Sequence, residues 1–269
     1  MKDDRLGGIR QFLYRNGFSS VQDIAVALGA SPATIRRDLQ RLEADGIVAR
    51  NHGGAAIAAA PGVEEAFEQR ERENLAEKRA IAEAAFERIR PGSALFLDAG
   101  TTVLQLARRI RLEPMPLAIF TNGLAIAEAL MGARDLKVTL IGGRVRPENA
   151  STVGPAAMEA VARLGLDQLF LGTGAVAEDG CLYGLDEDEA HLNALMIARA
   201  SETVLLADAS KFGRRLVHRV APLGPAIRVV TDEGLPAPWR HRLAELACPV
   251  AIAAGSAPSP IRSEERQSA

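Results

Sequence analysis

The sequence has few cysteines, few histidines and no long apolar run, and each shortage excludes a class of protein. Two cysteines, Cys181 and Cys248, are too few for a disulfide framework or a zinc site built on cysteine pairs. The histidines lack metal-ligand spacing, so we predict neither a metal nor a cofactor. No apolar run approaches the roughly 18 residues of a membrane-spanning helix, and the polar N-terminus does not resemble a signal peptide. We therefore expect a cytoplasmic protein.

The chain also lacks a strong net charge. Its 32 basic and 34 acidic residues give a formal charge of −2, which argues against a surface that is basic throughout. Nucleic-acid binding depends on local charge, however, and residues 1–55 hold eight basic and six acidic side chains. The length of 269 residues allows one large domain or a small domain followed by a medium one.

A basic helix is predicted over residues 32–45. Ser31 suits the N-cap, and Pro32 suits the first helical position because its missing N–H would have no partner there. One face carries an apolar stripe at helical spacing, made of Ile35, Leu39 and Leu42. The other faces are basic, and about 21 Å of such a helix fits the major groove of DNA.

Two shorter helices precede the basic helix and a hairpin follows it. Apolar spacing predicts a helix that ends near Asn16-Gly17 and a second one, capped by Ser19 or Ser20, that ends at a Gly29-Ala30 turn. After Gly46, residues 47–50 form a short strand and residues 51–54 a turn, which together predict a wing. This order is the helix-turn-helix pattern, and a generic three-helix bundle is the alternative. The candidate DNA contacts are Ser31, Thr34, Arg36, Arg37, Arg41, Arg50 and His52.

From residue 75 the pattern changes to alternating strands and helices. Strands are predicted at residues 94–98, 117–121, 136–141, 168–171, 203–207, 227–231 and 250–253. Helices are predicted at residues 76–90, 102–112, 124–131, 155–164, 189–201 and 239–246. This alternation predicts an α/β domain over residues 75–254, with a mainly parallel, doubly wound, Rossmann-like sheet.

The remaining segments are predicted to connect or to extend these domains. The DNA-binding domain covers residues 1–56, and residues 57–74 form a linker, of which residues 63–73 are dense in charge and suit a solvated helix or arm. Residues 255–269, rich in serine, proline and charge, are predicted to be a disordered tail.

Polar and glycine residues gather where the predicted parallel strands end. Residues 98–102 (DAGTT) follow the first strand and open a helix, and similar strings follow the next strands up to residues 208–213 (DASKFG). Free N–H groups at helix N-termini suit a phosphate, and Lys211 is a cation placed to neutralise one. Each string alone is better explained by the demands of a turn, but their convergence on one sheet edge favours an anion site.

Two groups of motifs resemble the DeoR family of transcriptional regulators. In the first, Leu28-Gly29, residues 34–39 (TIRRDL) and residues 52–55 (HGGA) are similar to the family's N-terminal signature. The second, with DAGTT, Gly172-x-Gly174, Glu189-Ala190 and DASKFG, resembles the family's sugar-phosphate-sensing domain, which is similar in fold to ribose-5-phosphate isomerases and coenzyme A transferases. The resemblance implies effector contacts from Asp98, Gly100, Thr101, Thr102, Thr121, Asn122, Gly172, Glu189 and Lys211. Many members carry lysine where this chain has Asn193, which leaves the identity of the effector open.

The resemblance implies a repressor of a sugar-metabolism operon that a phosphorylated sugar releases from double-stranded operator DNA. Because such operators are usually two-fold, we expect a homodimer or homotetramer. One alternative is a sugar-phosphate isomerase with a DNA-binding domain, in which Asp98 or Glu189 is the base and Lys211 stabilises the enediolate. We expect no enzyme, because no sequence feature singles out a catalytic carboxylate. An activator of the same architecture is the other alternative.

Overall fold

The computed structural model describes residues 2–44, 47–51, 53–57 and 63–254, and the chain divides into two compact units, residues 1–68 and 69–269. The division falls inside the segment 57–74 that the sequence predicts to be a linker. Much of that segment is a helix, α4 (Val63–Arg72). The predicted tail, residues 255–269, lies outside the described residues.

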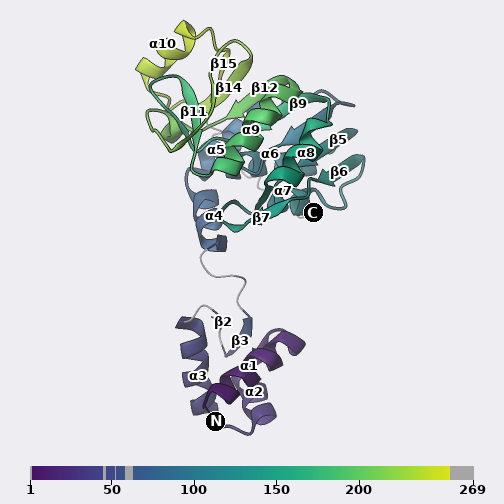
Figure 1. Cartoon of the computed structure of the whole chain (residues 1–269), viewed down its shortest axis with the longest axis vertical. Helices are drawn as coiled ribbons and strands as arrows, with labels where there is room; N and C mark the ends of the chain where they lie inside the picture. Colours follow the sequence, from purple (N-terminus) through teal and green to yellow (C-terminus); the bar gives the residue numbers. More distant parts are fainter. Residues whose placement is uncertain (1, 45–46, 52, 58–62, 255–269) are drawn as a thin grey trace, which may run out of the picture. The chain divides into compact units, whose positions relative to one another are not determined.

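Up to residue 57, the described part of the first unit contains three helices and a small antiparallel sheet (Figure 1). The helices are α1 (Lys2–Asn16), α2 (Val21–Leu28) and α3 (Pro32–Ala44). The sheet has the order β1-β3-β2, from β1 (Ser19–Ser20), β3 (Gly54–Ile57) and β2 (Val48–Asn51). Ile9, Ile24 and Ile35 are fully buried in its core, one from each helix. This is the predicted winged helix-turn-helix arrangement.

Local contacts fix both ends of α2, and an ion pair joins α1 to α3. Ser20 and Asp23 form a reciprocal capping box at the start of α2, and Gly29 ends that helix at φ 61°, a left-handed conformation that glycine adopts without strain. Asp38 is a carboxylate on the core side of α3, and Arg5 Nε of α1 donates to its Oδ2 over 2.6 Å. The ion pair therefore ties the first helix to the third.

The second unit is built on a seven-stranded parallel sheet of order β15-β14-β12-β9-β4-β5-β6. Its strands are β4 (Ala94–Leu97), β5 (Leu117–Thr121), β6 (Leu136–Leu140), β9 (Leu166–Leu171), β12 (Ala200–Leu206), β14 (Ile227–Asp232) and β15 (Val250–Ala253). The predicted parallel sheet is confirmed. The chain runs outward from β4 to β6 and returns to β9 on the other side of β4, so the strand order reverses between β4 and β9.

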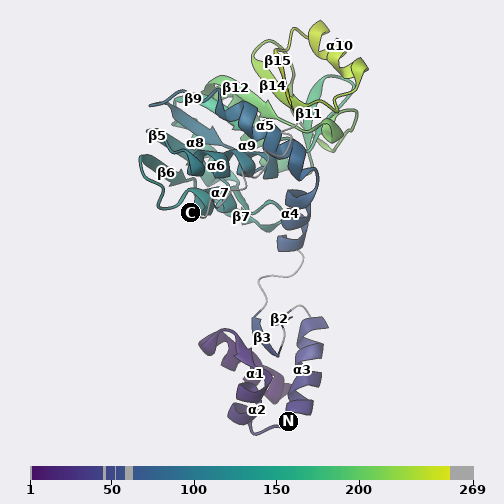
Figure 2. The same cartoon turned by 180° about the vertical axis from the view of Figure 1, so that it is seen from behind.

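Helices cover both faces of this sheet. Figure 1 shows α8 (Pro155–Ala162) and α9 (Glu187–Arg199) in front of the sheet. The view from behind shows α5 (Leu75–Phe86) and α6 (Thr101–Leu112) in front of it (Figure 2). Two further helices are α7 (Leu124–Leu130) and α10 (Ala237–Glu245). None of the helices among the described residues is long and apolar enough to cross a membrane.

Several short elements of the second unit were not predicted. One is a hairpin of β7 (Arg144–Arg146) and β8 (Ser151–Val153), joined by the short 3-10 helix η1 (Pro147–Asn149). Another is a small antiparallel sheet of β10 (Ala175–Val176), β11 (Cys181–Gly184) and β13 (His218–Pro222). None of these strands has the run of four or more apolar side chains that marks a buried strand in the sequence. The hairpin places polar residues beside the carboxyl ends of the large sheet.

Candidate DNA-binding face and effector site

The face of α3 that is turned away from the core is basic. Ile35, Leu39 and Leu42 are buried, whereas Arg36, Arg37 and Arg41 are exposed. At about 100° per residue, Arg37 lies roughly 200° around the helix from Ile35, almost opposite the core. The 13 residues of α3 form a helix about 20 Å long. Its open face has the size and charge that the major groove accepts.

The remaining candidate DNA contacts flank this helix. The Ser31 and Thr34 hydroxyl oxygens lie 2.8 Å apart, and Ser31 Oγ accepts from the Thr34 N–H over 3.2 Å, so Ser31 caps α3. Arg50 in the wing forms an ion pair with Glu43 at 3.1 Å, so part of its charge is neutralised within the unit. His52 lies outside the described residues.

In the second unit, the point where the strand order reverses brings the ends of β4 and β9 together. Asp98 Oδ2, directly after β4, accepts from the Gly172 N–H, directly after β9, over 3.0 Å. A Cβ added at Gly172 would lie 3.3 Å from both Asp98 Oδ2 and Gly100 Cα, which is tighter than ordinary contact. The two glycines therefore allow the backbones to approach. Ligands of open parallel sheets bind at such a reversal.

Asp98 is a buried carboxyl with unused hydrogen-bonding capacity. Asp98 is 3% exposed, and its Oδ1 atom has no hydrogen-bond partner among the described residues. Burial raises the pKa of Asp98 to about 7, and the negative charge of Glu189 adds to this effect. The N–H groups of Gly172 and Ala99 oppose the shift by donating to the carboxylate. Asp98 and Glu189 thus lie within electrostatic range of each other.

Backbone N–H groups also face this edge. α6 begins after Gly100, and no side chain in the described part of the chain caps its first turn. Thr101 and Thr102 are the first two residues of that helix and are buried. The uncapped N–H groups of a first turn, together with the helix dipole, favour an anion.

Two polar residues lie at the end of β5, one whose hydroxyl is already hydrogen-bonded and one with an acceptor that is not. Thr121 Oγ1 donates to the Leu97 carbonyl over 2.6 Å and accepts from the Gly123 N–H over 3.0 Å, so its hydroxyl ties β5 to β4. Asn122 Nδ2 donates to the Thr152 carbonyl over 3.3 Å, and Asn122 Oδ1 is buried without a partner among the described residues. Of these two predicted contacts, Asn122 is the better placed to hydrogen-bond a ligand.

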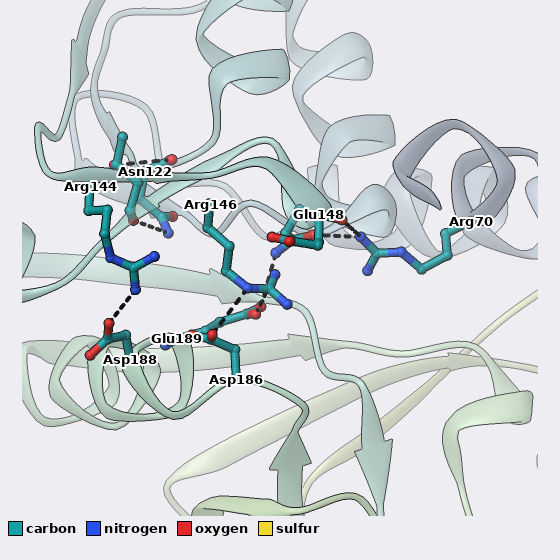
Figure 3. Close-up of polar contacts among 10 residues, drawn as sticks. Arg70, Asn122, Arg144, Arg146, Glu148, Asp186, Asp188 and Glu189 are labelled. Carbon is teal, nitrogen blue, oxygen red and sulfur yellow. Dashed lines mark hydrogen bonds and ion pairs between the residues drawn. The ribbon is translucent and has the colours of Figure 1, made fainter. Parts of the chain in front are cut away.

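The unpredicted β7–β8 hairpin meets the start of α9 in a network of charges (Figure 3). An Arg146 guanidinium nitrogen lies 2.9 Å from Glu189 Oε2, and its Nε lies 3.5 Å from Asp186 Oδ2. Asn149 Nδ2 donates to Glu189 Oε1 over 2.9 Å. Burial raises the pKa of Glu189, and the charges of Arg146 and Arg70 lower it. Glu189 is therefore a partly buried carboxylate, 19% exposed, that is held by cationic and amide partners.

Lys211 lies in a second group, at the end of β12. It is the last residue of the short 3-10 helix η2 (Ala209–Lys211), and Asp208 is the N-cap of that helix. Lys78 of α5 is 2% exposed, and burial lowers its pKa; the charge of Asp208 opposes this effect and that of Lys211 adds to it. Asn74 Nδ2 donates to Asp208 Oδ1 over 3.1 Å. Two lysines thus lie within electrostatic range of each other.

The structure therefore places the predicted effector residues at one edge of the sheet and brings further polar residues beside them. All the candidates lie at the carboxyl ends of β4, β5, β9 and β12 or on the first turn of α9. Sequence reasoning missed Arg146, Asn149 and Lys78. The first two lie in the hairpin, which has no sequence signal of its own, and Lys78 is an ordinary lysine in a predicted helix. No group of three or more metal-ligating side chains occurs within the described ranges.

A winged helix-turn-helix with a basic open face, followed by an α/β unit with a polar site at its strand ends, defines a DNA-binding transcriptional regulator with a sensor domain. Residues 5–60 match the DeoR-like helix-turn-helix domain, and residues 73–233 match the DeoR C terminal sensor domain. The chain belongs to the DeoR family, and the predicted membership is confirmed.

Curated relatives match over most of their length. The HTH-type transcriptional regulator GlpR of Haloferax volcanii is 40% identical over 224 residues, which cover 83% of this chain and 87% of the relative. The putative aga operon transcriptional repressor of Escherichia coli O157:H7 is 36% identical over 87% of both chains. The glycerol-3-phosphate regulon repressor of Escherichia coli K12 is 32% identical over 85% of this chain and 90% of the relative. These relatives are named as regulators and repressors and not as enzymes, in agreement with the expectation that the chain is no enzyme.

Among solved structures, ribose 5-phosphate isomerase A of Methanocaldococcus jannaschii is similar over 50% of this chain and 53% of its own, with 18% identity and a TM-score of 0.37. No functional conclusion follows from a likeness of this size.

Replacing Arg37 with alanine is expected to weaken binding to operator DNA and to flatten its dependence on salt, because one fewer phosphate counterion is released. The slope of log K against log salt should fall by about one. Electrophoretic or fluorescence titrations at several salt concentrations measure it. Arg134→Ala removes an equal charge from an exposed loop of the second unit and serves as control. If the slope for Arg37→Ala equals the slope for this control, Arg37 does not contact a phosphate.

The raised pKa of Asp98 predicts a pH-dependent stability. The folded protein keeps a proton up to about pH 7 that the unfolded chain releases near pH 3.8. Stability from this proton is fully present below pH 3.8 and is lost as the pH rises through 7. Because Asp98→Asn is neutral throughout, the wild type should lose about 2 kcal/mol relative to it between about pH 5.5 and 8.5. Thermal or denaturant unfolding measures this difference. Exposed Glu128→Gln is the control, and parallel curves for wild type and Asp98→Asn would contradict the assignment.

Proposed function

We propose that the protein is a repressor of a sugar-metabolism operon and that a phosphorylated sugar bound at the Asp98–Glu189 site releases it from operator DNA. The observation that supports this most directly is the meeting of buried, partly unsatisfied polar groups at the reversal of strand order in the second unit. The relatives named as operon and regulon repressors support the same function.

The two kinds of group at the site suit the two parts of such a ligand. Sugar hydroxyls donate hydrogen bonds, and Asp98 Oδ1 and Asn122 Oδ1 are buried acceptors that lack partners in the described part of the structure. A phosphate needs N–H donors and positive charge, which the uncapped first turn of α6 and the ammonium group of Lys211 provide. A ligand that satisfies buried polar groups gains affinity because those groups otherwise lie desolvated and unpaired.

Release of DNA requires two arrangements of the protein for which the ligand has different affinities. We propose that a homodimer or homotetramer, assembled through the second unit, binds a two-fold operator through two α3 helices. A repressor of chromosomal genes works where the chromosome lies, so we propose a cytoplasmic location. Transcription measured with and without the repressor gene distinguishes repression from activation.

A thermal-shift panel of phosphorylated sugars tests the ligand class. Glycerol 3-phosphate, ribose 5-phosphate, fructose 1-phosphate and glucose 6-phosphate are each compared with the unphosphorylated compound. A true effector at 100 times its Kd stabilises the folded state by about 2.7 kcal/mol and should raise Tm by about 5 °C or more. The same compound should release DNA. If every phosphorylated compound behaves like its unphosphorylated control, the proposed ligand class is wrong, and turnover of a compound would instead support an isomerase.

Replacing Lys211 with alanine is expected to leave DNA binding intact and to abolish release by the effector, because an ammonium group that neutralises the phosphate is lost. DNA titrations with and without the compound selected by the panel measure both properties. Lys137→Ala, an exposed lysine on β6, is the matched control. Normal release by the Lys211 variant would remove this residue from the effector site.

A further inference from the structure

The helix α4 connects the two units along the chain. It runs from Val63 to Arg72, and the division between the units falls between Glu68 and Gln69, inside the helix. In sequence it follows the wing strand β3 after residues 58–62. Any change in the last turn of α4 therefore acts on a segment that is covalently continuous with the DNA-binding unit.

The last turn of α4 is bound to the unpredicted hairpin through Arg70. A guanidinium nitrogen of Arg70 donates to the Glu148 carbonyl over 2.8 Å and to Asn149 Oδ1 over 2.9 Å (Figure 3). Both acceptors belong to η1, the connection between β7 and β8. Burial lowers the pKa of Arg70, and the negative charge of Glu189 opposes this effect. The guanidinium thus lies within electrostatic range of the carboxylate at the effector site.

Asn149 joins this contact to the effector site. Its residue is 3% exposed, its Oδ1 accepts from Arg70, and its Nδ2 donates to Glu189 Oε1 over 2.9 Å. An amide that is held at both ends cannot turn to satisfy one neighbour without breaking the bond to the other. A ligand that forms a hydrogen bond with Glu189 Oε1 competes with Asn149 Nδ2 for that oxygen. It therefore disturbs the position of Asn149 Oδ1, which accepts from Arg70.

Other contacts hold the same turn without reaching Glu189. The Lys78 ammonium group donates to the Arg70 carbonyl, and Arg108 of α6 forms an ion pair with Glu71 at 2.5 Å. The Arg108–Glu71 pair fastens α4 to a different helix, α6. It therefore serves as a comparison for the Arg70 contact, which also fastens α4 but in addition leads to the effector site.

We propose that Arg70 is the positioning residue that couples the effector site to DNA binding, through the Arg70–Asn149–Glu189 chain of hydrogen bonds. The coupling rests on the proposed function, because it gives the route by which a ligand at Glu189 changes affinity for DNA. When the ligand draws Asn149 away, Arg70 loses the Asn149 Oδ1 acceptor that links its guanidinium to the effector site, so the hairpin holds the last turn of α4 differently.

The first test measures coupling as the ratio of DNA Kd values with and without the compound selected by the panel, in the full-length chain. The DNA is a duplex selected from a random-sequence pool by binding to the wild type. For the wild type the ratio is expected to be about 5–150, as is usual for allosteric coupling. In Arg70→Ala it should fall to about one, while the compound still raises Tm. Arg108→Ala should keep the wild-type ratio, because it loosens α4 without touching Asn149 or Glu189.

The second test needs no effector. DNA Kd is measured for Arg70→Ala, Asn149→Ala and the double variant, with circular dichroism to show that each is folded. If the two side chains act through one contact, the double variant resembles Arg70→Ala, and the interaction between the two changes exceeds about twofold in Kd. Independent effects that multiply would overturn the proposal.

The outcomes separate this proposal from the proposed function. A wild-type ratio retained in Arg70→Ala overturns the coupling role and leaves the repressor function standing. If no compound of the panel raises Tm, the ligand is not a sugar phosphate. The DNA Kd values of the Arg70, Asn149 and double variants then still test whether the two side chains act through one contact. An equal loss of coupling in Arg70→Ala and Arg108→Ala would show a general loosening of α4 and would also overturn the specific role of Arg70.

Discussion

The parallel pairing of β4 with β9 is the constraint on which the effector site depends. Helices cover both faces of the sheet, so the carboxyl ends of the strands are where backbone and side chains remain open to a ligand. The reversal of strand order places Asp98 against Gly172 at this edge, where the carboxylate accepts a backbone N–H over 3.0 Å. The absence of a Cβ at Gly100 and Gly172 lets the two strand ends approach closely enough for that bond.

Uneven compensation of charge distinguishes the two carboxyl groups of the site, Asp98, which is buried, and Glu189, which is partly buried. Glu189 has Arg146 at 2.9 Å and an amide donor in Asn149, so cationic and polar neighbours offset its burial. Asp98 has two backbone donors, and burial raises its pKa to about 7. A group with such a pKa changes its charge near neutral pH, so a ligand that donates to Asp98 favours its ionised form and one that accepts from it favours the protonated form.

The DNA-binding unit separates its charges in a different way. On α3, Asp38 faces the core and is paired with Arg5, while Arg36, Arg37 and Arg41 remain on the open faces. Burying Asp38 and pairing it within the unit leaves Glu43 as the exposed acidic side chain of α3, and Glu43 is paired with Arg50 of the wing, so the exposed charge of the helix is mainly positive. A protein with a net charge of −2 can therefore present a locally basic helix to a phosphate backbone.

The sequence by itself determined the seven parallel strands, the three N-terminal helices, the basic face of α3 and the polar strand ends, because each depends on the spacing of neighbouring residues. Only the tertiary structure decided that Thr121 ties β5 to β4 while Asn122 Oδ1 has no partner among the residues that the structure describes. It also decided the contacts of Arg70, Arg146 and Asn149. Asn149 meets Glu189 across 40 residues and Arg70 meets the hairpin across 78, and the hairpin elements, of three residues each, are too short to carry a pattern. Such pairings follow from how the sheet and its hairpin pack, which local spacing does not encode.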